Sequence, residues 1–401
     1  MVKITKYMGR LVRYKPWRAD HFRLIMRDIR RPSAQAEQDH EIHLKASIDW
    51  LGRAQDVRRR ATDSGGVSAG WSFEDGWLPS YPETSGYIVE TFIAAAKVLN
   101  QPELLHRALS IIDWELSLQN TDGSFPGHFG EPGSAPVIFN TGQIMHGMLA
   151  GYIHFGRTEC LSAAVRAGQW MMERQDDDGC WRRSEHNGTP HTYNTRAAWA
   201  LLRTGLLAND ASLNRAAVQN LEWAYKQQTE SGWFATNAFT RNRAPFTHTI
   251  AYAIRGFLES ALLLGQERYL HTAEKAAAAL ANAQRENGWL TGVYDDGWVP
   301  AAYYCCLTGV AQMAINWERL SHVHRNRKYS TAIQRALSFL KKNQVISHEG
   351  NAVDGGLAGS VPIWGGYSRF EYPNWANKFF SDALMMDMED IVIPSTTKAG
   401  H

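Results

Sequence analysis

Apolar and polar positions divide the chain into alternating helical segments of two kinds. Segments of the first kind carry charges along one side, as in YLHTAEKAAAALANAQ, which is typical of half-solvated helices. We expect them at residues 40–55, 104–119, 159–175, 212–228, 268–284 and 329–344. Segments of the second kind, such as TRAAWALLRTGLL, are apolar on most faces, and we expect them at residues 84–99, 141–155, 194–207, 249–264, 305–320 and 375–388. The pattern predicts an all-α fold with a polar outer layer and an apolar inner layer.

A glutamine followed by a glycine turn recurs at the end of each outer segment. The glutamines are spaced by 64, 56, 53, 56 and 60 residues, and they are Gln55, Gln119, Gln175, Gln228, Gln284 and Gln344. A tryptophan stands five residues before each of the first four. Six helical hairpins are enough to close a ring, so we predict an (α/α)6 toroid, the plan of six-hairpin glycosidases and terpenoid cyclases. The repeats therefore overrule the two or three domains that 401 residues suggest.

The connections between the predicted helices are unequal. Links from an inner helix to the next outer helix are short, as in NQPE at 100–103, whereas those from outer to inner run to about 19 to 29 residues. Loops of that length are usually functional. Because helix direction alternates, the long loops gather at one end of the ring, together with the N-termini of the inner helices. Their unpaired N–H groups favour an anionic ligand in the central cavity.

Composition places the chain among soluble globular proteins, with 44% apolar and 20% charged residues. Charge is uneven, because residues 1–31 hold ten Lys or Arg and two Asp, whereas the remainder has six more acidic than basic residues. This arm either packs on the acidic body, which we favour, or contacts an anionic membrane surface. No specific nucleic acid is expected as a partner. We expect a basic arm at 1–36, the catalytic toroid at 37–392 and a flexible tail at 393–401.

Localisation and redox state follow from what the sequence lacks. No apolar run typical of a signal peptide follows the basic residues, and no stretch of about 18 apolar residues offers a membrane span. We therefore expect a cytoplasmic protein, peripheral at the inner face of the membrane if the arm binds lipid. Four cysteines in this length do not make a disulfide scaffold. Cys305 and Cys306, expected side by side on one helix, would point about 100° apart and share no zinc easily, so neither a metal nor a cofactor is expected.

Polar and aromatic residues gather where the inner helices are expected to begin, beyond the single residue that a helix cap needs. The candidate catalytic residues are Glu83, His191, Tyr193, His248 and Tyr252. The candidate substrate-binding residues are Tyr81, Asn140, Gln143, Asn194, Arg196, Arg255, Asp295, Asp296, Tyr303, Tyr304, Gln312, Tyr372, Asn374 and Lys378. His191 and His248 hold like positions in successive units, so we expect them on neighbouring walls of one cavity.

Structural roles compete with these functional ones. The simplest interpretation of five side chains is N-capping, namely Thr84, Asn140, Thr195, Thr249 and Asn374. Arg196 and Arg255 would be costly to bury unpaired, so each needs a carboxylate from the substrate or from the protein, where Glu83, Glu90 and Glu259 are the candidates. Aromatic residues of the long loops either fill gaps between hairpins or stack on sugar rings or another flat ligand.

Two resemblances extend this interpretation. Gln175-x3-Gly179-x-Trp181 resembles the Gln-Trp repeats of squalene and terpenoid cyclases and of protein prenyltransferases, which implies a helical toroid. Cyclase activity is not implied, because the chain has no Asp-x-Asp-Asp motif. Longer segments, including GWLPSYPETSGYI (76–88), PHTYNTRAAWALL (190–202) and YPNWANKFFSDALM (372–385), resemble an uncharacterised family of bacterial toroid proteins associated with polysaccharide biosynthesis. The plan is also similar to toroid glycoside hydrolases, sugar epimerases and polysaccharide lyases.

The resemblance to carbohydrate-active toroids suggests three functions. In a lyase or uronyl C5-epimerase, Arg196 or Arg255 would hold the uronate carboxylate, His191 or His248 would take the proton, and Tyr193 or Tyr252 would return one. A glycoside hydrolase would pair Glu83 with Asp295 or Asp296. A non-catalytic glycan-binding toroid would need only the aromatic residues. We favour proton abstraction on a uronic-acid-containing oligo- or polysaccharide.

Overall fold

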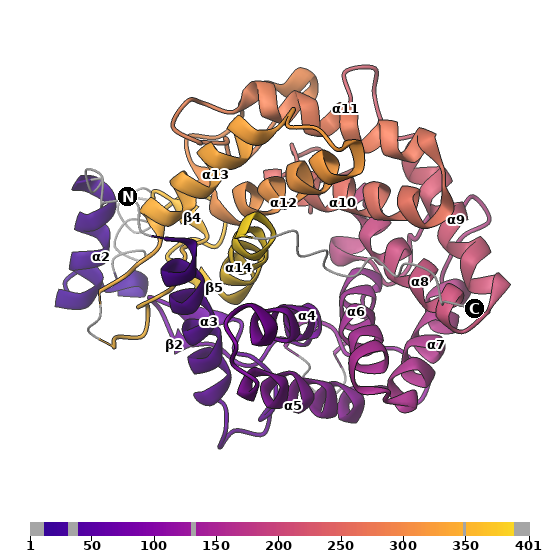
Figure 1. Cartoon of the computed structure of the whole chain (residues 1–401), viewed down its shortest axis with the longest axis horizontal. Coiled ribbons are helices and arrows are strands. Elements are labelled where there is room, and N and C mark those ends of the chain that lie inside the picture. Colours follow the sequence, from indigo (N-terminus) through magenta and orange to yellow (C-terminus); the bar gives the residue numbers. More distant parts are fainter. Residues whose placement is uncertain (1–11, 31–38, 130–133, 348–349, 389–401) are drawn as a thin grey trace, which may run out of the picture.

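The computed structural model describes residues 12–30, 39–129, 134–347 and 350–388. Within these residues, twelve helices pair into six antiparallel hairpins that close into two concentric rings (Figure 1). The outer ring consists of α3 (His40–Asp56), α5 (Glu103–Leu118), α7 (Thr158–Glu173), α9 (Ala211–Tyr225), α11 (Glu267–Ala283) and α13 (Ser330–Asn343). The inner ring consists of α4 (Pro82–Val98), α6 (Ile138–Phe155), α8 (Thr195–Leu207), α10 (Thr247–Leu264), α12 (Leu307–His324) and α14 (Asn374–Met388). The predicted (α/α)6 toroid is confirmed.

The repeated glutamine joins each hairpin to the next. Gln175 Nε2 donates to Gly179 O of its own turn at 3.0 Å and to Ala216 O of the following outer helix at 2.9 Å. Gln344 does the same across the ring closure, donating to Gly355 O at 2.9 Å and to His43 O of α3 at 3.1 Å. One side-chain amide thus satisfies two backbone carbonyls and sets the spacing of neighbouring hairpins.

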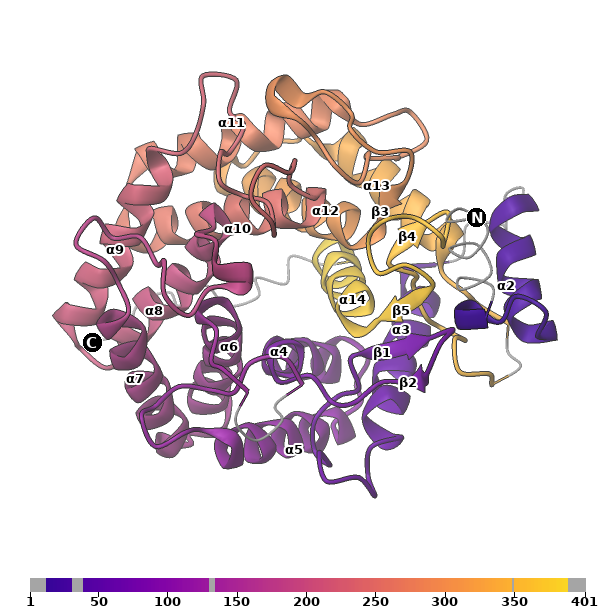
Figure 2. The same cartoon turned by 180° about the vertical axis from the view of Figure 1, so that it is seen from behind.

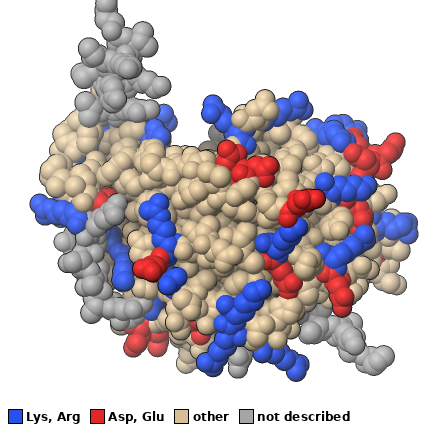
Figure 3. Space-filling model, turned by 90° about the horizontal axis from the view of Figure 1, so that it is seen from above, with Lys and Arg blue, Asp and Glu red and all other residues tan. Residues whose placement is uncertain are grey.

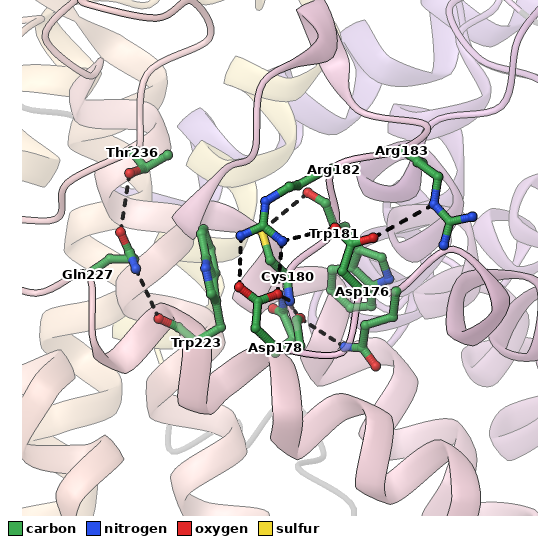
Figure 4. A network of polar contacts seen from close by, with 12 residues as sticks. Asp176, Asp178, Cys180, Trp181, Arg182, Arg183, Trp223, Gln227 and Thr236 are labelled. Carbon is green, nitrogen blue, oxygen red and sulfur yellow. Dashed lines mark hydrogen bonds and ion pairs between the residues drawn. The ribbon is translucent and has the colours of Figure 1, made fainter.

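The glycine in the turn is required by the backbone. Gly179 has a φ of +85°, and a Cβ there would stand 2.2 Å from the carbonyl oxygen of Gln219. The rest of this turn is tied by charge, since Arg182 pairs with Asp178 and with Asp176 (Figure 4). The turn residues therefore serve the joint between hairpins on the outside of the ring, away from the centre.

Short strands, which were not expected, tie the loops together. β1 (Gly70–Ser72) pairs antiparallel with β2 (Gly76–Trp77) and with β5 (Glu371–Pro373), so it joins the first and last units. β3 (Cys305–Cys306) pairs with β4 (Ser360–Val361). The expectation that both cysteines lie on a helix is therefore wrong, because the chain is still extended there and α12 begins at Leu307.

The described part of the N-terminal arm packs on the seam between the first and last units. In α2 (Ala19–Arg30), the buried His21 contacts the rings of Trp71 and Phe73. Asp28 Oδ2 accepts a hydrogen bond from Ile363 N at 2.5 Å. These contacts favour the packed alternative for residues 12–30; residues 1–11 and 31–38, and the tail expected at 393–401, lie outside the described residues. Among the helices that are described, none has the length and apolarity needed to cross a membrane.

The strands and long loops lie over one face of the double ring (Figure 2). Inner helices begin at this face, but not through the expected side-chain caps. Thr84 and Thr249 lie inside the first turn, where their hydroxyls donate to Tyr81 O at 3.2 Å and Phe246 O at 2.9 Å. Thr195 donates to Ala253 O of the neighbouring helix instead. Around the outer wall, Lys and Arg are interspersed with Asp and Glu (Figure 3).

Candidate functional site

A cavity of about 350 Å³ opens at the loop-covered end of the ring. We call it the mouth cavity. Its walls are mostly aromatic and come from four inner helices and the long loops; they include Tyr81, Glu83, Tyr87, Phe139, Asn140, His186, Tyr193, Phe239, Phe246, His248, Tyr252, Tyr367, Ser368 and Trp375. Aromatic faces with a few convergent polar groups are typical of small-molecule and sugar sites.

Glu83 is the single carboxyl group among the residues that line this cavity. It stands in the first turn of α4, and the Tyr81 hydroxyl donates to its Oε2 at 2.8 Å. Burial raises the pKa of Glu83 to about 7, against the opposing effects of the Tyr81 hydrogen bond and the Arg196 charge. The group therefore exchanges its proton near neutral pH, as a general acid or base must.

His248 faces the same cavity as a neutral imidazole. Its Nδ1 lies 2.8 Å from Gln312 Oε1, an oxygen that only accepts, so Nδ1 carries the proton and Nε2 is an acceptor. Burial lowers the pKa of His248 to about 3. Its ring also packs against Tyr252 with centroids 4.4 Å apart, and burial raises the pKa of that phenol. At neutral pH, Tyr252 is therefore a proton donor and His248 a hydrogen-bond acceptor.

A second and narrower cavity of about 40 Å³ lies beneath Tyr252, which lines both. We call it the inner chamber. Unlike the mouth cavity it is dominated by buried charges, and its lining includes Glu90, Arg196, Trp199, Arg203, Arg255, Glu259, Gln312, Asn316, Lys378 and Asp382. Four predicted binding residues thus lie one layer deeper than Glu83, namely Arg196, Arg255, Gln312 and Lys378.

Most charges of the inner chamber are paired within the protein. Arg203 pairs with Glu90 at 2.9 Å, and Lys378 pairs with Asp382. Arg255 pairs with Glu259 at 3.0 Å. Burial lowers the pKa of Arg255 to about 10 in spite of that partner. The expected internal ion pair with Glu259 is therefore confirmed for Arg255.

His191 does not line either cavity. Its ring stacks behind Tyr193, with centroids 4.4 Å apart and planes within 13°, and its Nε2 bonds to His186 O at 3.0 Å. Burial lowers its pKa to about 4. The expectation that His191 and His248 share a cavity is wrong, because residues 192–194 form a short 3-10 turn that brings Tyr193 to the wall instead.

Asn194 and Gln143 are also buried behind the walls. Asn194 Nδ2 donates to Glu185 Oε1 at 2.8 Å, and burial raises the pKa of that carboxyl group. Gln143 Oε1 accepts from Arg196 Nε at 2.7 Å. Both side chains hold other groups in place and do not face a cavity.

The remaining predicted residues lie away from both cavities. Asp295 and Asp296 are in an exposed turn, so the proposed pairing of Glu83 with either aspartate is wrong. Tyr303 is 64% exposed, and Tyr304 packs with Cys306 and Tyr367 in a small apolar cluster. Tyr372 and Asn374 are buried at the seam, where Asn374 Nδ2 donates to Ser68 O and Thr84 Oγ1.

Several lining residues were not among the predicted site residues. His186, Phe239 and Trp375 come from long loops or a helix start, and no repeated pattern marks which of their faces turns inward. Glu90, Arg203 and Asp382 line the inner chamber. The sequence could have indicated them, because each is a charged residue in a segment that is otherwise apolar. Among the described residues, no group of three or more His, Cys, Asp or Glu could hold a metal ion.

Comparisons with known proteins support the fold. The model of the squalene-hopene cyclase C-terminal domain matches residues 79–268, which confirms the resemblance seen in the repeats. No curated protein sequence matches the chain. Among solved structures, an unsaturated glucuronyl hydrolase from Bacillus sp. GL1, described as responsible for glycosaminoglycan degradation, has a TM-score of 0.68 and 15% identity, over 87% of this chain and 97% of that one.

Two further solved structures are similar along most of their length. Cellobiose 2-epimerase from Bacillus thermoamylovorans has a TM-score of 0.68 and 13% identity, over 87% of this chain and 99% of its own. An unsaturated glucuronyl hydrolase from Streptococcus agalactiae has a TM-score of 0.66 and 12% identity, over 91% of this chain and 95% of its own. At such identities the likeness establishes the toroid fold and leaves the reaction to be argued from the cavity.

Proposed function

We propose that the protein is a carbohydrate-active enzyme that transfers a proton to or from a sugar acid in the mouth cavity, with Glu83 as the catalytic base. The observation that carries this proposal is the pKa of about 7 that burial imposes on Glu83 inside an aromatic-walled cavity of about 350 Å³. Rings such as Trp375 and Tyr367 offer flat faces for a pyranose. The solved neighbours, named for glucuronyl and cellobiose chemistry, support a saccharide substrate.

The groups around Glu83 suit abstraction of the proton next to a carboxylate. Glu83 takes the C5 proton of a uronic acid, while the protonated Tyr252 donates to the carbon or to a departing oxygen. His248 Nε2 accepts a hydrogen bond from a sugar hydroxyl and so orients the ring. His248 is thus assigned to orientation, because an imidazole with a pKa of about 3 is a weak base at neutral pH.

Proton abstraction fits the cavity better than the alternatives. Two-carboxylate glycoside hydrolysis needs a second carboxyl group about 5 to 10 Å away, and Glu83 has none among the lining residues. A glycan-binding toroid would need the aromatic walls alone, and a buried carboxyl group held near its neutral-pH titration point gives binding no advantage. A role in polysaccharide biosynthesis stays a prediction.

The experiment is product analysis on uronate-containing polysaccharides in deuterated water. C5 deuterium without cleavage identifies an epimerase, and products that absorb in the ultraviolet identify a lyase. We expect Glu83→Gln to lower turnover by roughly 10²- to 10⁴-fold. Asp295→Asn is the matched control and should keep full activity.

Three results would each count against this assignment. Full turnover by Glu83→Gln would remove Glu83 from the reaction. Glycan binding that depends on Trp375, with no turnover on any uronate polymer, would favour the non-catalytic toroid. If Asp295→Asn proved as inactive as Glu83→Gln, with hydrolysis products from the wild type, the hydrolase would be the better description.

A further inference from the structure

Arg196 is a buried cation without a carboxylate partner among the described residues. Its side chain is 4% exposed, and the hydrogen bond that it makes runs from Nε to the neutral Gln143 Oε1 at 2.7 Å. Aromatic rings surround the guanidinium, with centroids 5.2 Å away for Tyr252, 5.5 Å for Trp199 and 5.7 Å for Phe379. These faces attract the cation through the partial negative charge of each ring, but they carry no net charge to neutralise it.

The carboxylates of the inner chamber are already engaged. Glu90 pairs with Arg203, and Asp382 pairs with Lys378 and accepts from Thr91. Glu259 serves two cations at once, Arg255 at 3.0 Å and Arg319 at 2.8 Å. Counting Arg319, which lies behind the lining, five cations face three carboxylates among the described residues.

This excess positive charge is buried, so it is unfavourable without a counter-ion. Its effect is visible on Lys378, whose pKa is lowered by burial and further by the charge of Arg196. An anion in the chamber would neutralise part of this excess charge and would raise the pKa of Lys378 again. Arg196 lines the chamber, and Gln143 occupies its Nε. Arginine can donate two parallel hydrogen bonds to one planar ligand.

We propose that the inner chamber binds a single carboxylate group, held by Arg196. The chamber volume of about 40 Å³ has room for about three water-sized atoms, enough for the three heavy atoms of a carboxylate. The forked donors of arginine match the same planar group.

The chamber adjoins the mouth cavity through Tyr252, and the charge of Arg196 is felt by Glu83. A sugar acid could therefore rest its ring in the mouth cavity and direct its carboxylate inward, leaving the neighbouring C–H bond beside Glu83. The assignment of this carboxylate to the substrate rests on the proposed function. A free carboxylate ligand could occupy the chamber instead, and Arg196 would bind it in the same way.

The test uses sodium formate as the carboxylate probe and formamide as its uncharged isostere, at constant ionic strength. Binding to the full chain is measured by calorimetry and by the shift in melting temperature. We expect formate to bind and stabilise the protein while formamide does not. Arg196→Gln should weaken formate binding by about 10- to 100-fold, as expected for a charge-assisted hydrogen bond. Arg196→Lys keeps the charge but loses the paired donors of the guanidinium. Its affinity for formate should therefore lie between those of the wild type and Arg196→Gln.

Arg182→Gln is the control, because Arg182 is 48% exposed in an outer turn and should leave formate binding unchanged. Equal binding of formate by the wild type and Arg196→Gln, or equal stabilisation by formate and formamide, would overturn the proposal. Competition between glucuronate and formate in Glu83→Gln protein would assign the carboxylate to the substrate, and binding of formate without competition would assign it to a free ligand. Since neither measurement needs turnover, the site can stand if the proposed reaction fails.

Discussion

The closure of the ring can be tested at one side chain, Gln344. Its amide makes three hydrogen bonds at the joint between the last and first units: Nε2 donates to His43 O and Gly355 O, and Oε1 lies 2.6 Å from His43 Nδ1. The side chain is fully buried. In Gln284, at the equivalent joint between the fifth and sixth units, Nε2 donates to Ala332 O. Replacing each with methionine keeps volume and removes the amide.

The expected difference follows from counting these bonds. Each buried hydrogen bond contributes about 1 kcal/mol net, so Gln344→Met should lower the free energy of unfolding by about 3 kcal/mol and Gln284→Met by about 1 kcal/mol. Urea unfolding followed by circular dichroism measures the free energy of unfolding of each variant. An unchanged m-value indicates that the variants expose the same surface on unfolding as the wild type. Hydrogen exchange should rise first in α3 and α13 of Gln344→Met. Equal losses in the two variants, or a larger loss for Gln284→Met, would refute the role assigned to the closing amide.

Three other predictions concern a turn, a buried acid and the site. Gly179→Ala should cost more than about 3 kcal/mol, because it adds a clash with Gln219 O to the strain of a positive φ; Gly156→Ala, with a φ of +67° and no atom within 4 Å, should cost only about 1 to 2 kcal/mol in thermal unfolding. Glu115 is fully buried without a hydrogen-bond partner among the described residues, and burial raises its pKa, so the folded state loses stability as pH rises above about 4.5. Glu115→Met should therefore raise the melting temperature more at pH 8 than at pH 5, and an equal gain at both would contradict this. Tyr81→Phe removes a hydrogen bond that lowers the pKa of Glu83, so the rising limb of the pH–rate profile near pH 7 should move to higher pH. If this limb stays in place or moves to lower pH, it does not report the titration of Glu83.

The repeats allowed the fold to be predicted closely. Helix ends differ from the expected ones by at most four residues, because the glutamine and the glycine turn mark where each outer helix stops. The strands were missed since they are two or three residues long and are formed by pairing between distant units, as in β1 with β5. Thr84, Asn140 and Thr249 were misplaced as caps because α4, α6 and α10 begin two or three residues earlier than expected. Thr84 and Thr249 therefore lie in the first turn, where their hydroxyls donate to backbone carbonyls.

The candidate site was predicted in part. Glu83, Asn140, Tyr193, His248 and Tyr252 do meet in the mouth cavity. Asp295 and Asp296, which were expected from the fifth long loop, do not line it, because they lie in an exposed turn. Proximity to a helix start in sequence fixes the height of a residue above the ring, but its direction around the helix depends on turns, such as residues 192–194, that the pattern does not reveal.

The depth at which a residue lies in the ring can be predicted from its spacing along an inner helix. Successive inward positions on a helix are three, four or seven residues apart, so a residue one or two turns after a mouth residue lies below it on the same face. Glu90 follows Glu83 by seven residues, and both line cavities at different depths. Arg255 and Glu259 follow Tyr252 by three and seven in the same way. On helices that are otherwise apolar, charged residues at this spacing predict a buried charged layer beneath the mouth. Among the described residues, this layer has more cations than carboxylates and Arg196 bonds only to the neutral Gln143, which favours an anionic ligand.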